Sequence, residues 1–212
     1  MNENLKSVKR WIYFVVGLFI MAFGVSFSIK GNLGTSPISS LPYVTGQISG
    51  LTVGTTTILL HCVLILLQIL ILRKRYEWIQ LLQLPIAVVF GLMTDFAVST
   101  LSFLHPASYL QQWLLCGIGI VLVAVGVSFE VTANVIVLAG EGFVLAVCKV
   151  CPVKFGTMKV VFDVSLVVIS CILSLVFLHG IYGVREGTVA AAVLVGTISR
   201  QMNRRLEGRF RS

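Results

Sequence analysis

The sequence predicts an all-α polytopic membrane protein, and three observations carry this prediction: its composition, its long apolar segments and an internal repeat. Hydrophobic residues make up 57% of the 212 residues and charged residues only 11%, far from the balance of a soluble domain. The net charge is +8, but the basic residues cluster at the ends of apolar segments, where they orient membrane helices. We therefore expect the lipid bilayer as a partner, and no nucleic acid.

Six segments are apolar and long enough to cross a bilayer, which takes about 20 residues each. The sixth is the weakest, because it is short and rich in alanine and glycine. The distribution of lysine and arginine over the connections predicts that both termini are cytoplasmic. The expected spans are 11–29, 55–72, 79–103, 112–130, 158–178 and 187–203, followed by a basic cytoplasmic tail at 204–212.

Residues 11–64 reappear, without a gap, at residues 113–166, a constant offset of 102. Three spans fall in each copy, and an odd number makes the second copy enter the membrane from the opposite face. We expect a single membrane domain, 1–212, in which repeat 1 (about 11–103) and repeat 2 (about 112–203) form an inverted-topology pair. The aligned identities are Trp11/Trp113, Gly17/Gly119, Ala22/Ala124, the run 24–27 with 126–129, Asn32/Asn134, Gly54/Gly156, Thr55/Thr157 and Leu64/Leu166.

Each copy has a long apolar connection between its first and second spans. In the first, Thr35 or Ser36 can cap a helix and Pro37 suits its first position, so we expect a helix to about residue 48, ended by Gly50. In the second, we expect a helix over about 142–150. Both helices are predicted to be re-entrant or broken, since non-helical backbone is tolerated inside a membrane only where protein or water lines it. A pair of interfacial helices lying flat is the alternative.

The stretch Leu33–Ser39, with Gly17 and Gly24 before it and Gly54-Thr55 after it, resembles the YczE/YyaS/YitT family of bacterial integral membrane proteins. The resemblance covers the first five spans and is most specific at 33–39. It implies a polytopic fold in the bacterial cytoplasmic membrane and names no substrate. It concerns the membrane part only, because the soluble C-terminal domain of some relatives has no counterpart in this sequence.

Glu141 is the strongest candidate for a binding residue, because an ionisable side chain in an apolar segment is costly unless it is paired or hydrated. It lies between Gly140 and Gly142, where the backbone can approach a ligand. A buried carboxylate there could carry a coupling proton or bind an amine or cation; a solvated surface charge is the alternative. The other expected substrate- or ion-binding residues are Asn32, Gly34, Thr35, Ser36, Ser39, Asn134, Gly140 and Gly142.

Three further polar residues lie within expected spans. His61 and Asp163 occupy the same position in the two copies, and we expect either a proton relay or gate, or structural hydrogen bonds. Asp95 is a third candidate for this role, and its alternative is pairing with an arginine or a helix end. The five cysteines include a single C-x-x-C without a second pair, so we expect no metal and no cofactor.

These features predict a secondary transporter of a small solute or ion, proton-coupled, with a central site where the repeats meet. In that site Glu141 and the turn 35–39 are expected to lie together. The alternatives are a channel with two re-entrant half-helices and the substrate-binding subunit of a multicomponent uptake system. Neither HExxH nor GxSxG occurs, so we expect no enzyme. A homodimer is left open.

Overall fold

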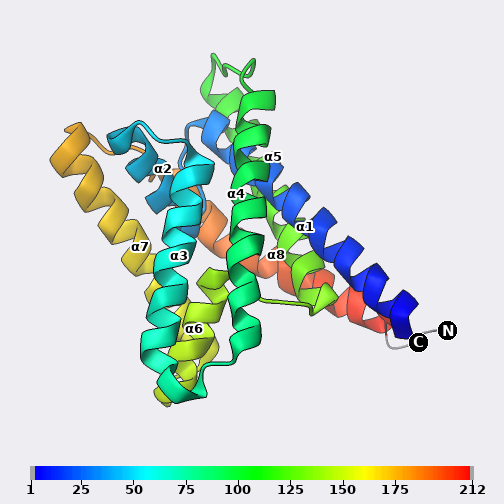
Figure 1. Cartoon of the computed structure of the whole chain (residues 1–212). Helices are drawn as coiled ribbons and strands as arrows, with labels where there is room; N and C mark the ends of the chain where they lie inside the picture. Colours follow the sequence, from blue (N-terminus) through cyan, green and yellow to red (C-terminus); the bar gives the residue numbers. More distant parts are fainter. Residues whose placement is uncertain (1–2, 211–212) are drawn as a thin grey trace. The chain divides into compact units, whose positions relative to one another are not determined.

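The computed structural model describes the backbone of residues 3–210 and the side chains of residues 8–203, and this part of the chain is helical without strands (Figure 1). The basic tail expected at 204–212 lies outside the described side chains. The elements are α1 (Glu3–Gly31), α2 (Pro37–Ser49), α3 (Val53–Leu72), the 3-10 turns η1 (Arg73–Arg75) and η2 (Trp78–Leu82), α4 (Gln83–Thr100), α5 (Tyr109–Ala133), α6 (Ala139–Val150), α7 (Phe155–Leu178) and α8 (Glu186–Phe210).

Within the described residues, five helical segments are long and apolar enough to cross a membrane. They coincide with the first five expected spans: Val8–Gly31, Val53–Arg75, Trp78–Thr100, Tyr109–Ala133 and Phe155–Leu178. The sixth expected span, 187–203, is helical as part of α8 but is not among the five. Polar residues such as Thr188, Thr197 and Arg200 interrupt its apolar run, so a sixth span stays a prediction.

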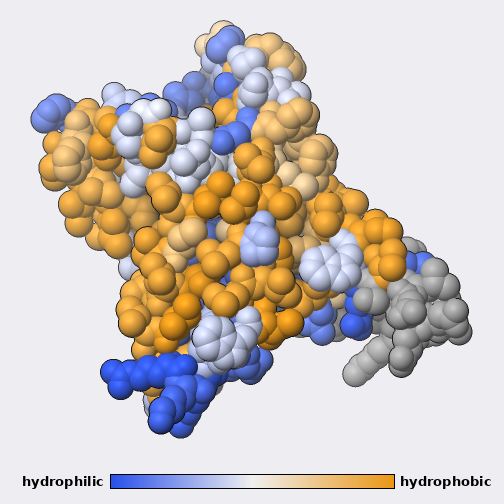
Figure 2. All heavy atoms as spheres, in the orientation of Figure 1, coloured by the Kyte–Doolittle hydropathy of each residue, from blue (hydrophilic) through white to orange (hydrophobic). Residues whose placement is uncertain are grey.

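The outer surfaces of the long helices are apolar, as lipid-facing surfaces are. On α3, for example, Leu59, Leu66 and Leu70 are all exposed. In Figure 2, hydrophobic side chains cover most of α3 and α4, whereas hydrophilic ones gather at the lower end of α3, where η1 follows. The apolar band and its basic border fit a helix that ends at a membrane surface.

The chain divides into two compact units, and each takes segments from both sequence copies. Unit 1 contains α1, α5 and α8 and comprises Met1–Ser36, Phe96–Val135 and Arg185–Ser212. Unit 2 contains α2, α3, α6, α7 and most of α4 and comprises Pro37–Asp95 and Ile136–Val184. Each unit is described by itself.

In unit 1, α1 and α5 pack closely through glycines and run antiparallel. A Cβ on Gly17 would lie 3.0 Å from the carbonyl oxygen of Gly126, and a Cβ on Gly24 would lie 2.9 Å from that of Gly119. Positions therefore rise along one helix as they fall along the other. The offset of 102 converts one glycine pair into the other, because it matches Gly17 with Gly119 and Gly24 with Gly126.

In unit 2, α2 packs on α7, and α6 packs on α3. The offset of 102 also converts one of these contacts into the other, since α2 corresponds to α6 and α3 to α7. The core between these helices contains Leu64 and its counterpart Leu166, both 4% exposed, together with Val144 and Phe162. The short helices α2 and α6 thus each lie against a long helix of the other copy.

The helix boundaries repeat as well. The first helices of the copies end at Gly31 and Ala133, the short helices begin at Pro37 and Ala139, and the next begin at Val53 and Phe155, each pair 102 residues apart. After the first helices, Asn32 (φ 53°) and Asn134 (φ 47°) both adopt the left-handed conformation that ends a helix. Both copies therefore have asparagine at this position because asparagine tolerates the left-handed conformation better than most residues.

The predicted bounds are right for α2 and wrong at the start of α6. α2 begins at Pro37, and Gly50 follows its end with φ +74°. α6 begins at Ala139 rather than near Gly142. Its cap position is Leu138, whose side chain makes no capping hydrogen bond, so no polar cap residue marks this start in the sequence. Glu141 consequently lies in the first helical turn and not in a loop.

Candidate functional site

Glu141 lies where the start of α6 meets α7. The preceding residue, Gly140, packs against Ile38 and Phe162, because a Cβ there would meet both side chains. One turn later, the rings of Phe143 and Phe162 pack with centroids 5.2 Å apart. The backbone around Glu141 is thereby held against residues 159–163 of α7.

Two charged residues of α7 act on the carboxyl group of Glu141. Lys159 Nζ donates a hydrogen bond to Asp163 Oδ1 at 2.7 Å, and their side chains are 29% and 23% exposed. Burial raises the pKa of Glu141 above its ordinary value; the positive charge of Lys159 opposes this rise and the negative charge of Asp163 adds to it. Two carboxylates and one ammonium group thus share a half-buried region at the start of α6.

Two buried glutamines contact the same turn at Gly142. Gln68 of α3 and Gln83 of α4 are 1% and 2% exposed. Gln68 Nε2 donates to Gln83 Oε1 and to the carbonyl oxygen of Ala139, both at 3.1 Å. Gln68 Oε1 has no hydrogen-bond partner within the described part of the chain. A Cβ on Gly142 would lie 2.9 Å from this oxygen, so the glycine leaves room for the amide beside the helix.

In the corresponding contact, between α2 and α7, two polar side chains pair with each other. The hydroxyl groups of Ser40 and Ser170 lie 3.0 Å apart and both side chains are fully buried. Each hydroxyl also lies 2.7 Å from a backbone carbonyl oxygen of its own helix, so one hydroxyl donates across the pair while the other donates to its carbonyl. Under the offset, Ser40 corresponds to Gly142 and Ser170 to Gln68. The contact between α2 and α7 therefore contains paired hydroxyls, whereas the equivalent contact between α6 and α3 contains an unpaired amide oxygen.

The remaining membrane candidates each have a local partner in unit 2. His61 is 3% exposed and stacks on Phe90 with centroids 6.2 Å apart. Asp95 accepts hydrogen bonds from Thr52 Oγ1 (2.6 Å) and from the backbone N–H of Gly54 (2.7 Å). Asp95 therefore binds the N-terminal end of α3, as its structural alternative expected.

The expected site residues are divided between the two units. Ser39, His61, Asp95, Gly140, Glu141, Gly142 and Asp163 belong to unit 2, whereas Asn32, Gly34, Thr35, Ser36 and Asn134 belong to unit 1. A common site for Glu141 and the whole turn 35–39 therefore stays a prediction. Within the described residues, no group of three or more His, Cys, Asp or Glu side chains could hold a metal ion.

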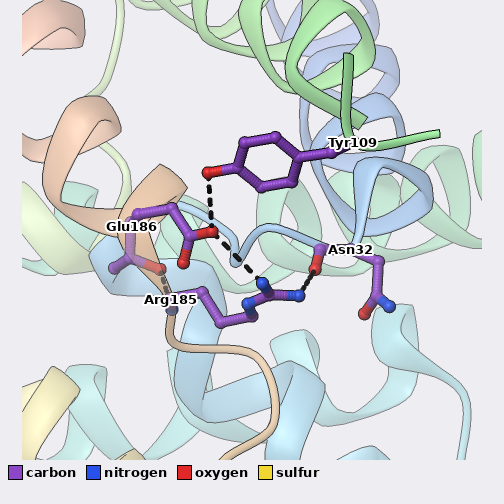
Figure 3. Close-up of polar contacts among 5 residues, drawn as sticks. Asn32, Tyr109, Arg185 and Glu186 are labelled. Atoms are coloured by element: carbon purple, nitrogen blue, oxygen red, sulfur yellow. Dashed lines mark hydrogen bonds and ion pairs between the residues drawn. The ribbon is translucent and has the colours of Figure 1, made fainter. Parts of the chain in front are cut away.

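Unit 1 contains a polar cluster that the sequence did not predict (Figure 3). Arg185 donates to the carbonyl oxygen of Asn32 at 3.0 Å and to Glu186 Oε1 at 3.2 Å, and Tyr109 donates to the same carboxylate oxygen at 3.2 Å. The backbone N–H of Glu186 contributes most to holding the pKa of its carboxyl below the ordinary value, and Arg185 and Tyr109 add to this effect. The cluster joins the end of α1 to the starts of α5 and α8.

The left-handed turn after α1 explains how this cluster forms. Gly34 has φ +97°, and a Cβ there would meet the Thr188 hydroxyl and the backbone of Arg185. Gly187 N–H donates to the carbonyl oxygen of Leu33 at 2.8 Å. The turn 32–34 is thus fixed to the start of α8. In the sequence, the only indication of this cluster was Arg185, the one lysine or arginine in the connection 179–186.

Comparison with known proteins places the chain among membrane proteins. The family described as "Family of unknown function (DUF6198)" matches residues 8–204. "Uncharacterized membrane protein YczE" of Bacillus subtilis (strain 168) is 34% identical over 130 residues, which cover 60% of this chain and 57% of that protein. "Uncharacterized protein YyaS" of the same organism is 32% identical over 120 residues, which cover 55% and 57%. No solved structure matches.

The chain thus spans a little over half the length of the curated relatives it matches. The resemblance based on residues 33–39 is confirmed for YczE and YyaS, while its YitT part stays a prediction. Together with the five apolar helices, the similarity to a relative named as a membrane protein identifies an integral membrane protein.

Proposed function

The chain belongs to DUF6198, a family of unknown function, and we propose that it is a proton-coupled secondary transporter of a small solute or ion in the bacterial inner membrane. The observation that carries the proposal is the half-buried group of Glu141, Lys159 and Asp163 at the start of a short helix. Ionisable side chains at membrane depth are typical of proton relays and substrate pathways. We propose no enzymatic activity.

Matched features of the two copies support an inverted-topology pair. The helix boundaries recur after 102 residues, the equivalent helices α1 and α5 run antiparallel, and the contacts of α2 and α6 exchange under the same offset. Two copies of opposite orientation provide the two related conformations that alternating access requires. We include α8 as the sixth span, with both termini cytoplasmic as the basic connections favour.

The lengths and burial of α2 and α6 support re-entrant helices. They have 13 and 12 residues, too few to cross a bilayer, which takes about 20 residues. Both bury one side against long helices, and α2 buries Ser39 and Ser40. Such helices bring polar groups toward the middle of the membrane while the surrounding protein satisfies their backbone.

Reconstitution tests this function. Ligands found by thermal-shift screening of the purified protein are offered to proteoliposomes with an imposed pH gradient, and we expect saturable uptake that collapses when a protonophore removes the gradient. Glu141→Gln abolishes the dependence on the pH gradient, whereas Glu77→Gln leaves it intact; Glu77 is an exposed glutamate just before η2 that pairs with Lys149. Non-saturating conductance contradicts the proposal in favour of a channel, and uptake that requires an ATPase partner contradicts it in favour of a subunit of a larger system.

A further inference from the structure

The first turn of α6 presents one hydrogen-bond acceptor that the protein leaves unused. Both N–H groups of the Gln68 amide are engaged, with Gln83 Oε1 and with the carbonyl oxygen of Ala139, so the orientation of the amide is fixed. Its Oε1 is left without a partner among the described residues, on a side chain that is only 1% exposed. A buried acceptor without a donor is unfavourable. A ligand that donates a hydrogen bond here would remove that cost.

The charges around the same turn sum to one negative charge. Glu141 and Asp163 are acidic, and Lys159 alone is basic. An uncompensated charge in a half-buried region is unfavourable, so it is neutralised either by a proton or by a bound cation. The positive end of α6 does not call for an external anion, because the carboxylate of Glu141 already lies in its first turn.

Aromatic rings border this charged group. Lys159 Nζ lies 5.7 Å from the centroid of the Phe162 ring, and Phe143 packs on the same ring. Ring faces attract ammonium groups and also accept apolar chains. Gly140 and Gly142 carry no side chains of their own, so Ile38 approaches the first turn of α6 before Glu141 and the amides of Gln68 and Gln83 approach it after Glu141.

We propose that the first turn of α6 binds a small organic ammonium ion with an apolar arm, which exchanges with a proton on Glu141. The ammonium group donates to Gln68 Oε1 and neutralises the Glu141 carboxylate, while the apolar arm lies along Phe143 and Phe162. A sodium ion suits the site less well, because a hard cation needs several oxygen ligands and the turn offers one free amide oxygen beside a carboxylate. This proposal rests on the proposed transport function and names its substrate class.

Exchange follows from the use of one carboxylate for two ligands. The proton and the ammonium ion each neutralise Glu141, so binding of one expels the other. The charged groups that act on Glu141 are Lys159 and Asp163 of α7, while α3 and α4 face the turn with the uncharged amides Gln68 and Gln83. Because burial holds the pKa of Glu141 above its ordinary value, the proton competes increasingly as the pH falls toward that pKa.

Calorimetry on the purified full-length protein tests the proposal. Methylammonium, butylammonium and benzylammonium chlorides are titrated in two buffers of different ionisation enthalpy, below and above the pH at which Glu141 titrates. We expect at least one of the three to bind, with release of about one proton per ammonium at the lower pH and none at the higher, because one carboxyl group titrates. Tetramethylammonium, which has the charge but no N–H donor, should bind about tenfold more weakly.

Variants locate the site. Glu141→Gln should weaken ammonium binding about 30-fold or more and abolish proton release. The matched control Glu77→Gln, also in unit 2, should change neither. The comparison between ammonium and tetramethylammonium uses the unaltered protein, so it remains decisive even if Glu141→Gln fails to fold.

Four outcomes overturn the proposal: none of the three ammonium ions binds, binding releases no proton at either pH, Glu141→Gln binds as the parent does, or sodium chloride produces the same proton release. Transport itself is tested separately. If proteoliposomes carry a neutral or anionic solute while the ammonium ions do not bind, the substrate class is wrong and the transporter stands. If ammonium binds with proton release but never crosses the membrane, the transport function is wrong and the site stands.

Discussion

The contact between α1 and α5 joins the two copies symmetrically, whereas the equivalent contacts of α2 with α7 and of α6 with α3 differ in chemistry. At the first, glycine pairs related by the offset bring the backbones together. At the second, Ser40 and Ser170 pair their hydroxyls, while their counterparts Gly142 and Gln68 leave an unpaired oxygen. Close packing therefore requires glycine at equivalent positions of α1 and α5, whereas the short helices α2 and α6 differ in the polar groups they contact.

The charged residues follow the same division. Glu141, Lys159 and Asp163 correspond to Ser39, Thr57 and His61, so every charged member of the group in the second copy has an uncharged polar or histidine counterpart in the first. Burying charge requires compensation, and a protein that needed only packing would not concentrate three ionisable groups there. We infer that α6 carries the chemistry and that α2 provides a structural counterpart.

The largest loss of stability is expected at the contact between α1 and α5, where both copies have glycine. A methyl group on Gly24 would lie 2.6 Å from the backbone nitrogen of Val123, and a backbone atom in a packed helix pair cannot move aside. Gly24→Ala should lower the free energy of unfolding by about 3 kcal/mol, measured by denaturant titration in detergent micelles. Gly117→Ala on α5, where no atom lies within 4 Å of the new methyl, is the control and should be neutral or slightly stabilising. Equal effects of the two substitutions would contradict the glycine contact.

An intermediate loss of stability is expected at the contacts of α2 and α6, where the two copies have different residues. Gly142→Ala pushes a methyl group against the Gln68 and Gln83 amides, at 2.9 and 2.8 Å, and should cost about 1–2 kcal/mol as their hydrogen bond is broken. Ser40→Ala removes one hydrogen bond between helices and should cost about 0.6 kcal/mol, since Ser170 keeps its bond to Leu166. The same unfolding assay measures both variants. A larger loss for Ser40→Ala would reverse the proposed roles of α2 and α6.

The smallest effect concerns the starts of α3 and α7. Thr52 caps α3 by accepting from the Thr55 N–H, whereas its counterpart Lys154 provides no side-chain cap for α7. Lys154→Thr should therefore stabilise the protein by about 0.5–1 kcal/mol, because it adds a cap and removes a positive charge from a helix N-terminus. Thermal unfolding compares it with Lys154→Val, which removes the charge without adding a cap. If the valine variant is as stable, capping contributes nothing at this end.

The sequence alone predicted those parts of the fold that have local patterns. Five spans follow from apolar length, and α2 from the order of Ser36, Pro37 and Gly50. The early start of α6 was missed because its cap residue is leucine. The division into two units was missed as well, since it depends on contacts between helices distant in the sequence.

The candidate site was predicted only where it is charged. Glu141 and Asp163 stand out in apolar segments, but Gln68 and Gln83 are uncharged, and nothing in the sequence says that both meet Gly142. Arg185 donates to the carbonyl oxygen of Asn32, 153 positions away. Every residue has a backbone carbonyl, so the sequence cannot indicate which one accepts this bond. Hydrogen bonds between distant helices therefore required the structure.

Labelling two matched cysteines tests the inverted pair most directly. Cys151 follows α6 and is exposed, and its counterpart Ser49 ends α2 and is also exposed. In a background without the other cysteines, a membrane-impermeant maleimide is applied to intact cells and to inverted membrane vesicles. We expect Ser49→Cys to be labelled from the outside only and Cys151 from the cytoplasmic side only. Labelling of both positions from the same side would contradict opposite orientations of the two copies.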